Sequence, residues 1–196
     1  MTETEFLLWV RGPALQVASI IFILGIAARV LEILILGRKR DLAEARGSAV
    51  AGGLRTIVTR TFQDPGTWKR STFTLVAGFI FHIGLFITIL LYAPHILVIE
   101  EVLGVSWPAL PTPVVDATAV ITIIALVAVL VHRMRDPVMR FLSRFQDYLV
   151  WFVTILPLIT GYMAFHRLGL SPTMMLAIHI LSVELLMVVF PFTKLT

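Results

Sequence analysis

The sequence predicts an all-α integral membrane protein, built as a bundle of five transmembrane helices. Its 196 residues are 58% hydrophobic and only 14% charged, and the mean hydropathy of +0.94 is far above that of a soluble domain. Five stretches approach or exceed the roughly 20 apolar residues that a helix needs to cross a bilayer. Too few polar residues remain to cover a soluble domain, which excludes a soluble enzyme. We treat residues 1–196 as a single membrane domain.

The five apolar windows are separated by polar connections. They cover residues 12–36, 72–98, 113–131, 145–165 and 173–192. The first window follows acidic residues and is too long for a signal peptide, so we expect a retained helix. Residues 99–112 contain Pro108 and Pro111 and are expected to form a rigid cap. Residues 37–70 are expected to include a short surface helix that contacts anionic lipid or a protein partner.

Basic residues are distributed unevenly between the two sides of this bundle. Residues 37–70 carry eight Lys or Arg, residues 133–144 carry four, and Lys194 adds one, whereas the opposite side carries only Arg11 and Arg167. The excess of positive charge on cytoplasmic loops then places the N-terminus outside and the C-terminus in the cytoplasm. We therefore expect a multi-pass protein of the inner (cytoplasmic) membrane.

Histidine is the candidate metal ligand. The absence of cysteine excludes disulfides, thiolate-bound iron–sulfur clusters and covalent c-type haem. His82 lies 12 residues, about 18 Å, from Arg70, and His179 lies at a similar depth in the fifth window. Two deep histidines on separate helices favour a shared metal such as haem iron. The alternative is a neutral histidine that hydrogen-bonds between helices.

The other histidines lie near the ends of the predicted helices. His95 follows Pro94, and on an ideal helix it would lie about 140° around the axis from His82 unless the proline kinks the chain. His166 ends the fourth window on the same side as His95. Either residue could be a ligand, a quinone contact or an ordinary interfacial residue. His132 lies next to basic residues and is expected to be a solvated surface residue.

Three further ionisable residues lie within the windows. Arg29 and Glu32 are three residues apart and are expected to pair on one helix face. Glu184 follows His179 by five residues and therefore projects from a different face. It is either protonated and hydrogen-bonded or part of a proton relay.

Several of these residues resemble motifs of the membrane cytochrome b (gamma) subunit family of respiratory nitrate reductases, which has relatives in heterodisulfide reductase and sulfite-reduction-associated complexes. The resemblance covers essentially the whole chain. Its most specific pieces are Phe81-His82-Ile83-Gly84 and His179 with Phe190-Pro191-Phe192-Thr193-Lys194-Leu195, and Arg29 is a weaker piece.

The resemblance implies five helices with the N-terminus outside and two b-type haems between the second and fifth helices. It implies electron transfer between a quinone near the outer haem and an iron–sulfur subunit inside. It also implies that His82 is an axial ligand of the inner haem and His179 of the outer haem.

The chain departs from the family pattern at two positions. Tyr92 stands where the family has a second histidine in helix two, and His95 is the nearest substitute. No histidine follows Leu195. Three arrangements remain: two haems with a substitute ligand opposite His82, one outer haem on His95 and His179, or one haem shared by His82 and His179. We favour an outer haem on His95 and His179, with His82 serving an inner haem and His166 as a weaker cofactor contact.

The expected function is that of a haem b subunit that transfers electrons between the quinone pool and an iron–sulfur or catalytic partner at the cytoplasmic face. We favour two haems per chain, and one is possible. The partner would hold the clusters, because this chain has no cysteine. We expect no catalytic residue acting on a soluble substrate and no nucleic-acid partner. The alternatives are a proton-coupled transporter or channel subunit, and a haem-free membrane anchor.

Overall fold

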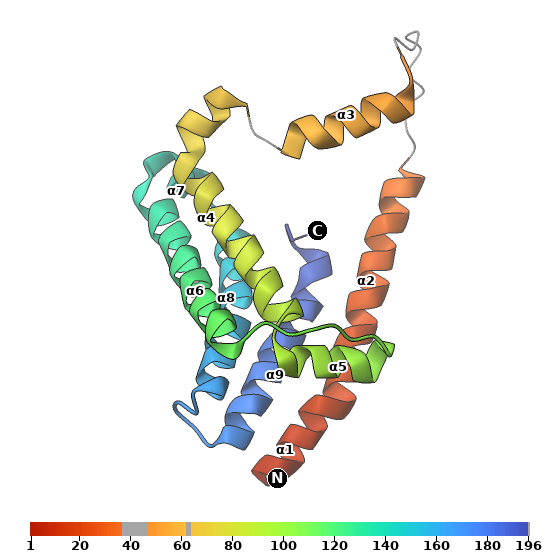
Figure 1. Cartoon of the computed structure of the whole chain (residues 1–196), viewed down its shortest axis with the longest axis vertical. Coiled ribbons are helices and arrows are strands. Elements are labelled where there is room, and N and C mark those ends of the chain that lie inside the picture. Colours follow the sequence, from red (N-terminus) through yellow and green to blue (C-terminus); the bar gives the residue numbers. More distant parts are fainter. Residues whose placement is uncertain (37–46, 62–63, 196) are drawn as a thin grey trace.

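The structure is a computed structural model that describes residues 1–36, 47–61 and 64–195, and these residues form helices and connecting turns without a β-strand. Five helical segments are long and apolar enough to cross a membrane: Glu3–Ile35, Pro65–Leu90, Thr112–Arg135, Phe145–Phe165 and Pro172–Phe192. Figure 1 shows them as one bundle, with α5 lying across it toward one end and α3 across the other. The predicted all-α fold with five membrane-length helices is confirmed.

The first span is a composite helix. It consists of α1 (Glu3–Trp9), a π-helical turn (Val10–Ala14) and α2 (Leu15–Ile35). Pro13 lies inside the π-helical turn, where the wider backbone accommodates a residue that has no N–H to donate. In α2, Gly25 lies directly against Pro191, and a β-carbon at this position would overlap the proline ring. This close contact fixes α2 against the end of the fifth span.

The second span ends earlier than the sequence predicted. Helix α4 (Pro65–Leu90) stops before α5 (Ala93–Leu103) begins, so the expectation of one helix to residue 98 is wrong. Pro94 explains the break, since its ring would clash with the carbonyl of Leu90 in a continuous helix. His95 therefore lies on a separate helix, and its predicted angle to His82 does not apply.

The expected cap over residues 99–112 is partly helical. Helix α5 continues to Leu103 and ends at Gly104, whose φ of 70° is the left-handed conformation that glycine adopts at helix ends. The chain then folds back on the end of α4, where the Trp107 indole donates to the Leu90 carbonyl at 2.6 Å and the Leu110 amide donates to the Leu91 carbonyl at 2.9 Å.

The remaining spans form the packed part of the bundle. They are α6 (Thr112–Arg135), α8 (Phe145–Phe165) and α9 (Pro172–Val189), the last followed by a 3₁₀ turn (Phe190–Phe192); the short α7 (Pro137–Leu142) connects α6 to α8. Leu126, Ile155 and Leu158 form a buried cluster between α6 and α8. Helix α4 packs along α6, whereas α9 packs along α8 and α2.

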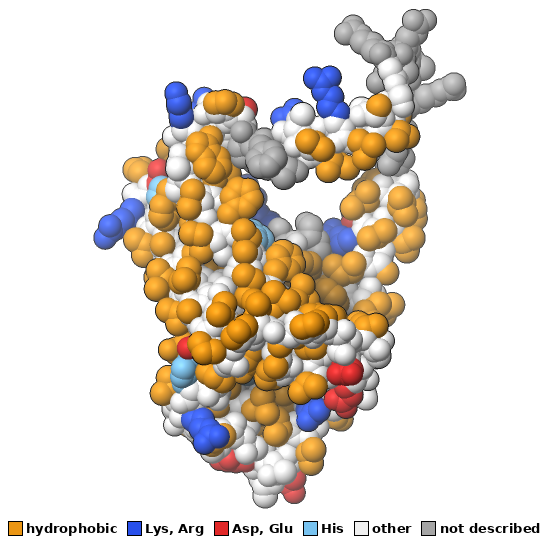
Figure 2. All heavy atoms as spheres, in the orientation of Figure 1, with side chains coloured by type: hydrophobic (Ala, Val, Ile, Leu, Met, Phe, Trp, Pro, Cys, Tyr) orange, Lys and Arg blue, Asp and Glu red, His pale blue; other side chains and the backbone are white. Residues whose placement is uncertain are grey.

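Helices α4 and α9 do not pack extensively along one another within the described ranges. In the space-filling view an opening separates α4 from α2 and α3 (Ala49–Thr61) (Figure 2). Hydrophobic side chains cover the middle of the molecule, and charged side chains gather toward its two ends. We call these the α5 end and the α3 end. Helix α3 is the short helix expected between residues 37 and 70; residues 37–46 and 62–63 of that stretch lie outside the described ranges.

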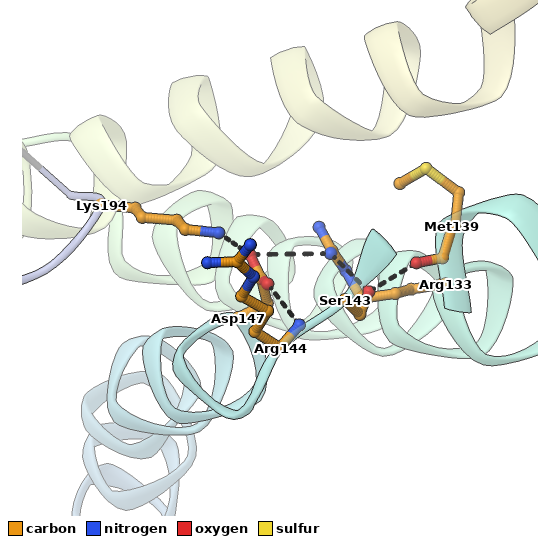
Figure 3. A network of polar contacts seen from close by, with 6 residues as sticks. All are labelled: Arg133, Met139, Ser143, Arg144, Asp147 and Lys194. Carbon is orange, nitrogen blue, oxygen red and sulfur yellow. Dashed lines mark hydrogen bonds and ion pairs between the residues drawn. The ribbon is translucent and has the colours of Figure 1, made fainter. Parts of the chain in front are cut away.

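Asp147 organises the α3 end of the packed helices. Its carboxylate accepts a hydrogen bond from Lys194 Nζ at 2.9 Å and from the Arg144 amide at 2.8 Å, and it lies 3.8 Å from Arg133 Nη1 (Figure 3). Arg133 also donates to Ser143 Oγ at 2.9 Å. One carboxylate therefore connects the C-terminal segment to α8 and α6.

Candidate functional site

His95 and His179 lie next to one another near the α5 end of the bundle. Their ring centroids are 6.1 Å apart and their planes differ by 19°. His95 comes from the first turn of α5 and His179 from α9, and both are partly buried. A metal ion bonded at about 2 Å to one nitrogen of each imidazole would hold the ring centres about 6 Å apart. The centroid distance of the pair is therefore compatible with two imidazoles bound to one metal ion.

A hydrogen bond fixes the tautomer of His95. Its Nδ1 lies 2.8 Å from the Thr88 carbonyl, which can only accept, so the proton is on Nδ1. Nε2 of His95 then carries a free lone pair, the form of histidine that binds a metal. His179 Nδ1 lies 3.3 Å from Thr160 Oγ1, a hydroxyl that is also within hydrogen-bond distance of the Leu156 carbonyl and of Ser182 Oγ.

The α8–α9 interface sets the position of the His179 ring. Thr160 Oγ1 lies 2.9 Å from Ser182 Oγ, and Ser182 donates to the His179 carbonyl at 2.6 Å. A β-carbon on Gly161 would lie 2.9 Å from Cε1 of the His179 ring. Glycine at this position therefore lets α8 approach the imidazole closely.

His82 has the same tautomer as His95 but lies apart from the pair. Its Nδ1 is 2.7 Å from the Gly78 carbonyl, which again leaves Nε2 with a free lone pair. The ring is exposed and contacts Phe81. His82 lies six residues before Thr88, the residue whose carbonyl holds His95. Six residues correspond to about 9 Å along α4. The structure thus brings His179 together with His95, and it does not bring His82 to either of them.

The donor set of the pair fits haem. Within the described ranges no group of three or more His, Cys, Asp or Glu side chains could hold a metal ion. Two imidazoles suit an iron whose other four ligands come from a porphyrin, and axial histidines from facing helices are the usual haem ligands of helical bundles. His95 and His179 are the residues that would hold such a group.

His166 pairs with a residue that the sequence analysis did not single out. Its Nε2 lies 2.8 Å from Asp116 Oδ1, with His166 at the end of α8 and Asp116 in the second turn of α6. The sequence could have indicated Asp116, because a charged residue inside an apolar window usually pairs with another residue or has a function. His166 is therefore not part of the His95–His179 pair, although Phe165 and Tyr92 connect the two sites through ring contacts.

The other predicted residues lie away from the pair. The expected Arg29–Glu32 ion pair is confirmed at 2.9 Å, and Arg29 Nε also donates to the Pro191 carbonyl at 2.9 Å. His132 contacts the Phe73 ring near the α3 end, with centroids 4.7 Å apart. Glu184 is buried at 4% exposure, and its Oε1 has no hydrogen-bond partner among the described residues.

Comparison with known proteins gives one informative relationship. No family model matches the sequence. No solved structure matches it either. A protein of Nitratidesulfovibrio vulgaris (strain Hildenborough) is 34% identical over 197 aligned positions, which cover 96% of this chain and 85% of the relative. At this identity and coverage, the chain belongs to the same family as the Nitratidesulfovibrio vulgaris protein.

Proposed function

We propose that this protein is a haem b membrane subunit that transfers electrons between the quinone pool and an iron–sulfur or catalytic partner of a respiratory complex. The observation that carries the proposal is the His95–His179 pair, with its ring spacing of 6.1 Å and the unprotonated Nε2 atom of His95. Haem iron, when bound, supplies reversible one-electron chemistry. The chain supplies the ligands, their orientation and an apolar environment.

The hydrogen bonds of the pair have a defined role in this proposal. The Thr88 carbonyl and the Thr160 hydroxyl hold the two rings by Nδ1, which points each Nε2 atom away from its own anchor. Such bonds also increase the basicity of the ligating nitrogen. His82 would bind a second haem, nearer the α3 end. The other axial ligand of this haem would be a group other than His95 and His179.

The proposed orientation places the α3 end in the cytoplasm. Thirteen Lys and Arg residues belong to the connections and C-terminal segment on that side, against two on the other, as the positive-inside rule requires. Helix α3 carries Arg55 and Arg60, and its exposed apolar residues recur at helical spacing: Val50, Leu54, Ile57 and Val58. A helix of this kind fits the boundary of an anionic lipid leaflet, and the neighbouring basic segments would receive the iron–sulfur partner.

The proposal is tested by haem content after substitution. We expect His179→Ala and His95→Ala to remove the haem of this site, because each deletes one axial ligand. His132→Ala is the matched control and should leave the haem content unchanged, since this ring lies near the α3 end against Phe73. Purified protein of each variant, assayed for haem b per chain, gives the answer. Equal haem content in all variants would contradict the proposed ligands.

A second candidate function rests on Glu184. A buried carboxyl group with an unpartnered oxygen among the described residues is a feature of proton pathways in membranes. A proton-coupled transporter or channel subunit would use such a group and would contain no haem. Protein that is purified from haem-sufficient cells without a Soret band would favour this candidate or a haem-free anchor.

A further inference from the structure

The last turn of α4 has backbone carbonyls that no amide of its own helix reaches. A helix leaves its final carbonyls without helical donors, and Pro94 has no N–H that could donate to Leu90 four residues earlier. Three groups from later in the chain bond to these carbonyls instead. They are the His95 imidazole, the Trp107 indole and the Leu110 amide, which bond to the carbonyls of Thr88, Leu90 and Leu91 at 2.8, 2.6 and 2.9 Å, respectively.

Helix α5, which carries His95, has few other contacts with the bundle. Of its eleven residues only Ile96 is buried, and only His95 and Ile99 are partly buried. The Arg11–Glu101 ion pair joins α5 to the first span at 3.3 Å, but both side chains are largely exposed, and exposed pairs of this kind contribute little to stability. A helix with so little buried apolar surface opens locally at a low free-energy cost. The hydrogen bonds to α4 therefore matter for the position of α5.

Trp107 connects the far end of α5 back to α4. Helix α5 ends at Gly104, and the chain then returns toward the bundle (Figure 1). Trp107 follows Gly104 by three residues, and its indole bonds to Leu90, only three residues before α5 begins. The last turn of α4 thus holds the segment that carries α5 near both of its ends.

We propose that Trp107 is a positioning residue for His95: its hydrogen bond to the Leu90 carbonyl holds α5 against the bundle and thereby keeps His95 next to His179. This inference rests on the proposed function, in which His95 is an axial ligand. Tryptophan is also common at membrane surfaces, where its N–H bonds to water or lipid headgroups. Here the N–H bonds instead to the helix that precedes the ligand.

Binding of carbon monoxide to the dithionite-reduced protein tests this role. Carbon monoxide occupies the sixth position of ferrous haem only while His95 is detached, so its binding rate follows the fraction of protein in which α5 is open. Loss of one hydrogen bond changes such an equilibrium by roughly two- to tenfold. We therefore expect Trp107→Phe, which keeps an aromatic ring and removes the N–H, to bind carbon monoxide roughly two- to tenfold faster than the wild type, with unchanged haem content.

Trp151→Phe is the matched control. The Trp151 indole also donates to a backbone carbonyl, that of Leu126 at 2.8 Å, but it joins α8 to α6 and has no contact with α5. We expect this variant to keep the wild-type rate. Any reaction of a second haem is common to all three proteins and cancels in the comparison. A wild-type rate in Trp107→Phe, or an equal increase in both variants, would overturn the positioning role.

Amide hydrogen exchange of α5 gives a second measurement that does not depend on haem. We expect the amides of α5 to exchange roughly two- to tenfold faster in Trp107→Phe and at the wild-type rate in Trp151→Phe. Unchanged exchange in Trp107→Phe would show that Trp107 does not hold α5 and would overturn the inference. Absence of haem from the wild-type protein would instead refute the proposed function, and with it the role of His95 as a ligand.

Discussion

At the residue scale, the imidazole ring of each of the three candidate histidine ligands is held by a hydrogen bond to a backbone carbonyl or to a hydroxyl. His82, His95 and His179 are bonded through Nδ1 to Gly78 O, Thr88 O and Thr160 Oγ1 at 2.7, 2.8 and 3.3 Å. The two carbonyls can only accept, so His82 and His95 carry the proton on Nδ1 and have a free lone pair on Nε2. The sequence could identify these histidines by type and depth. It could not identify the Thr160 anchor, because Thr160 reaches His179 only across the α8–α9 interface.

The geometry of the pair predicts a specific spectrum. The His95 and His179 planes differ by only 19°, and near-parallel axial imidazoles split the iron d orbitals strongly. We expect a rhombic low-spin signal in the electron paramagnetic resonance spectrum of the oxidised protein. A highly anisotropic low-spin signal, typical of perpendicular planes, or a high-spin signal would contradict this ligand arrangement.

At the element scale, Pro94 decides where the candidate site lies. Hydropathy alone extends the second span to residue 98, but the proline ends α4 at Leu90 and starts a new helix that lies across the bundle (Figure 1). This break brings His95 to His179. The proline was visible in the sequence as a possible kink, whereas the direction of α5 depends on contacts such as Trp107 with the end of α4, which no local pattern predicts.

The packing of α4 on α6 gives a stability prediction. A β-carbon on Gly84 would overlap the Thr122 hydroxyl, and Thr122 is fully buried. We expect Gly84→Ala to destabilise the protein by about 1–3 kcal/mol, the usual cost of overpacking. Gly78→Ala is the matched control on the same helix, since a β-carbon there meets nothing within 4 Å.

Thermal unfolding in detergent would measure both glycine variants. The midpoint of Gly84→Ala should fall clearly below that of the wild type, and the midpoint of Gly78→Ala should remain close to it. Equal midpoints for the two variants would show that α4 and α6 do not approach as closely as described.

At the scale of the whole molecule, composition and hydropathy were sufficient to predict five spans, because each span is an apolar run of membrane length. The helix pairings were not predictable in the same way. They depend on close contacts between distant residues, such as Gly25 with Pro191 and Asp147 with Lys194. The Asp116–His166 contact is of the same kind, since 50 residues separate its partners.

The proposed orientation is directly testable because the chain has no cysteine. We expect a single cysteine at Glu101, at the α5 end, to react with a membrane-impermeant maleimide added to spheroplasts. A single cysteine at Arg60, on α3, should react only in inverted vesicles. Both side chains are exposed. The opposite labelling pattern would reverse the assigned orientation.

The central claim is that the chain binds haem b through His95 and His179, and a pyridine haemochrome measurement on the purified protein tests it most directly. We predict at least one haem b per chain, rising to two if His82 serves a second haem, with the His95–His179 haem lost in His179→Ala. Protein purified from haem-sufficient cells with no haem b, or His179→Ala protein with the full wild-type content, would contradict the claim.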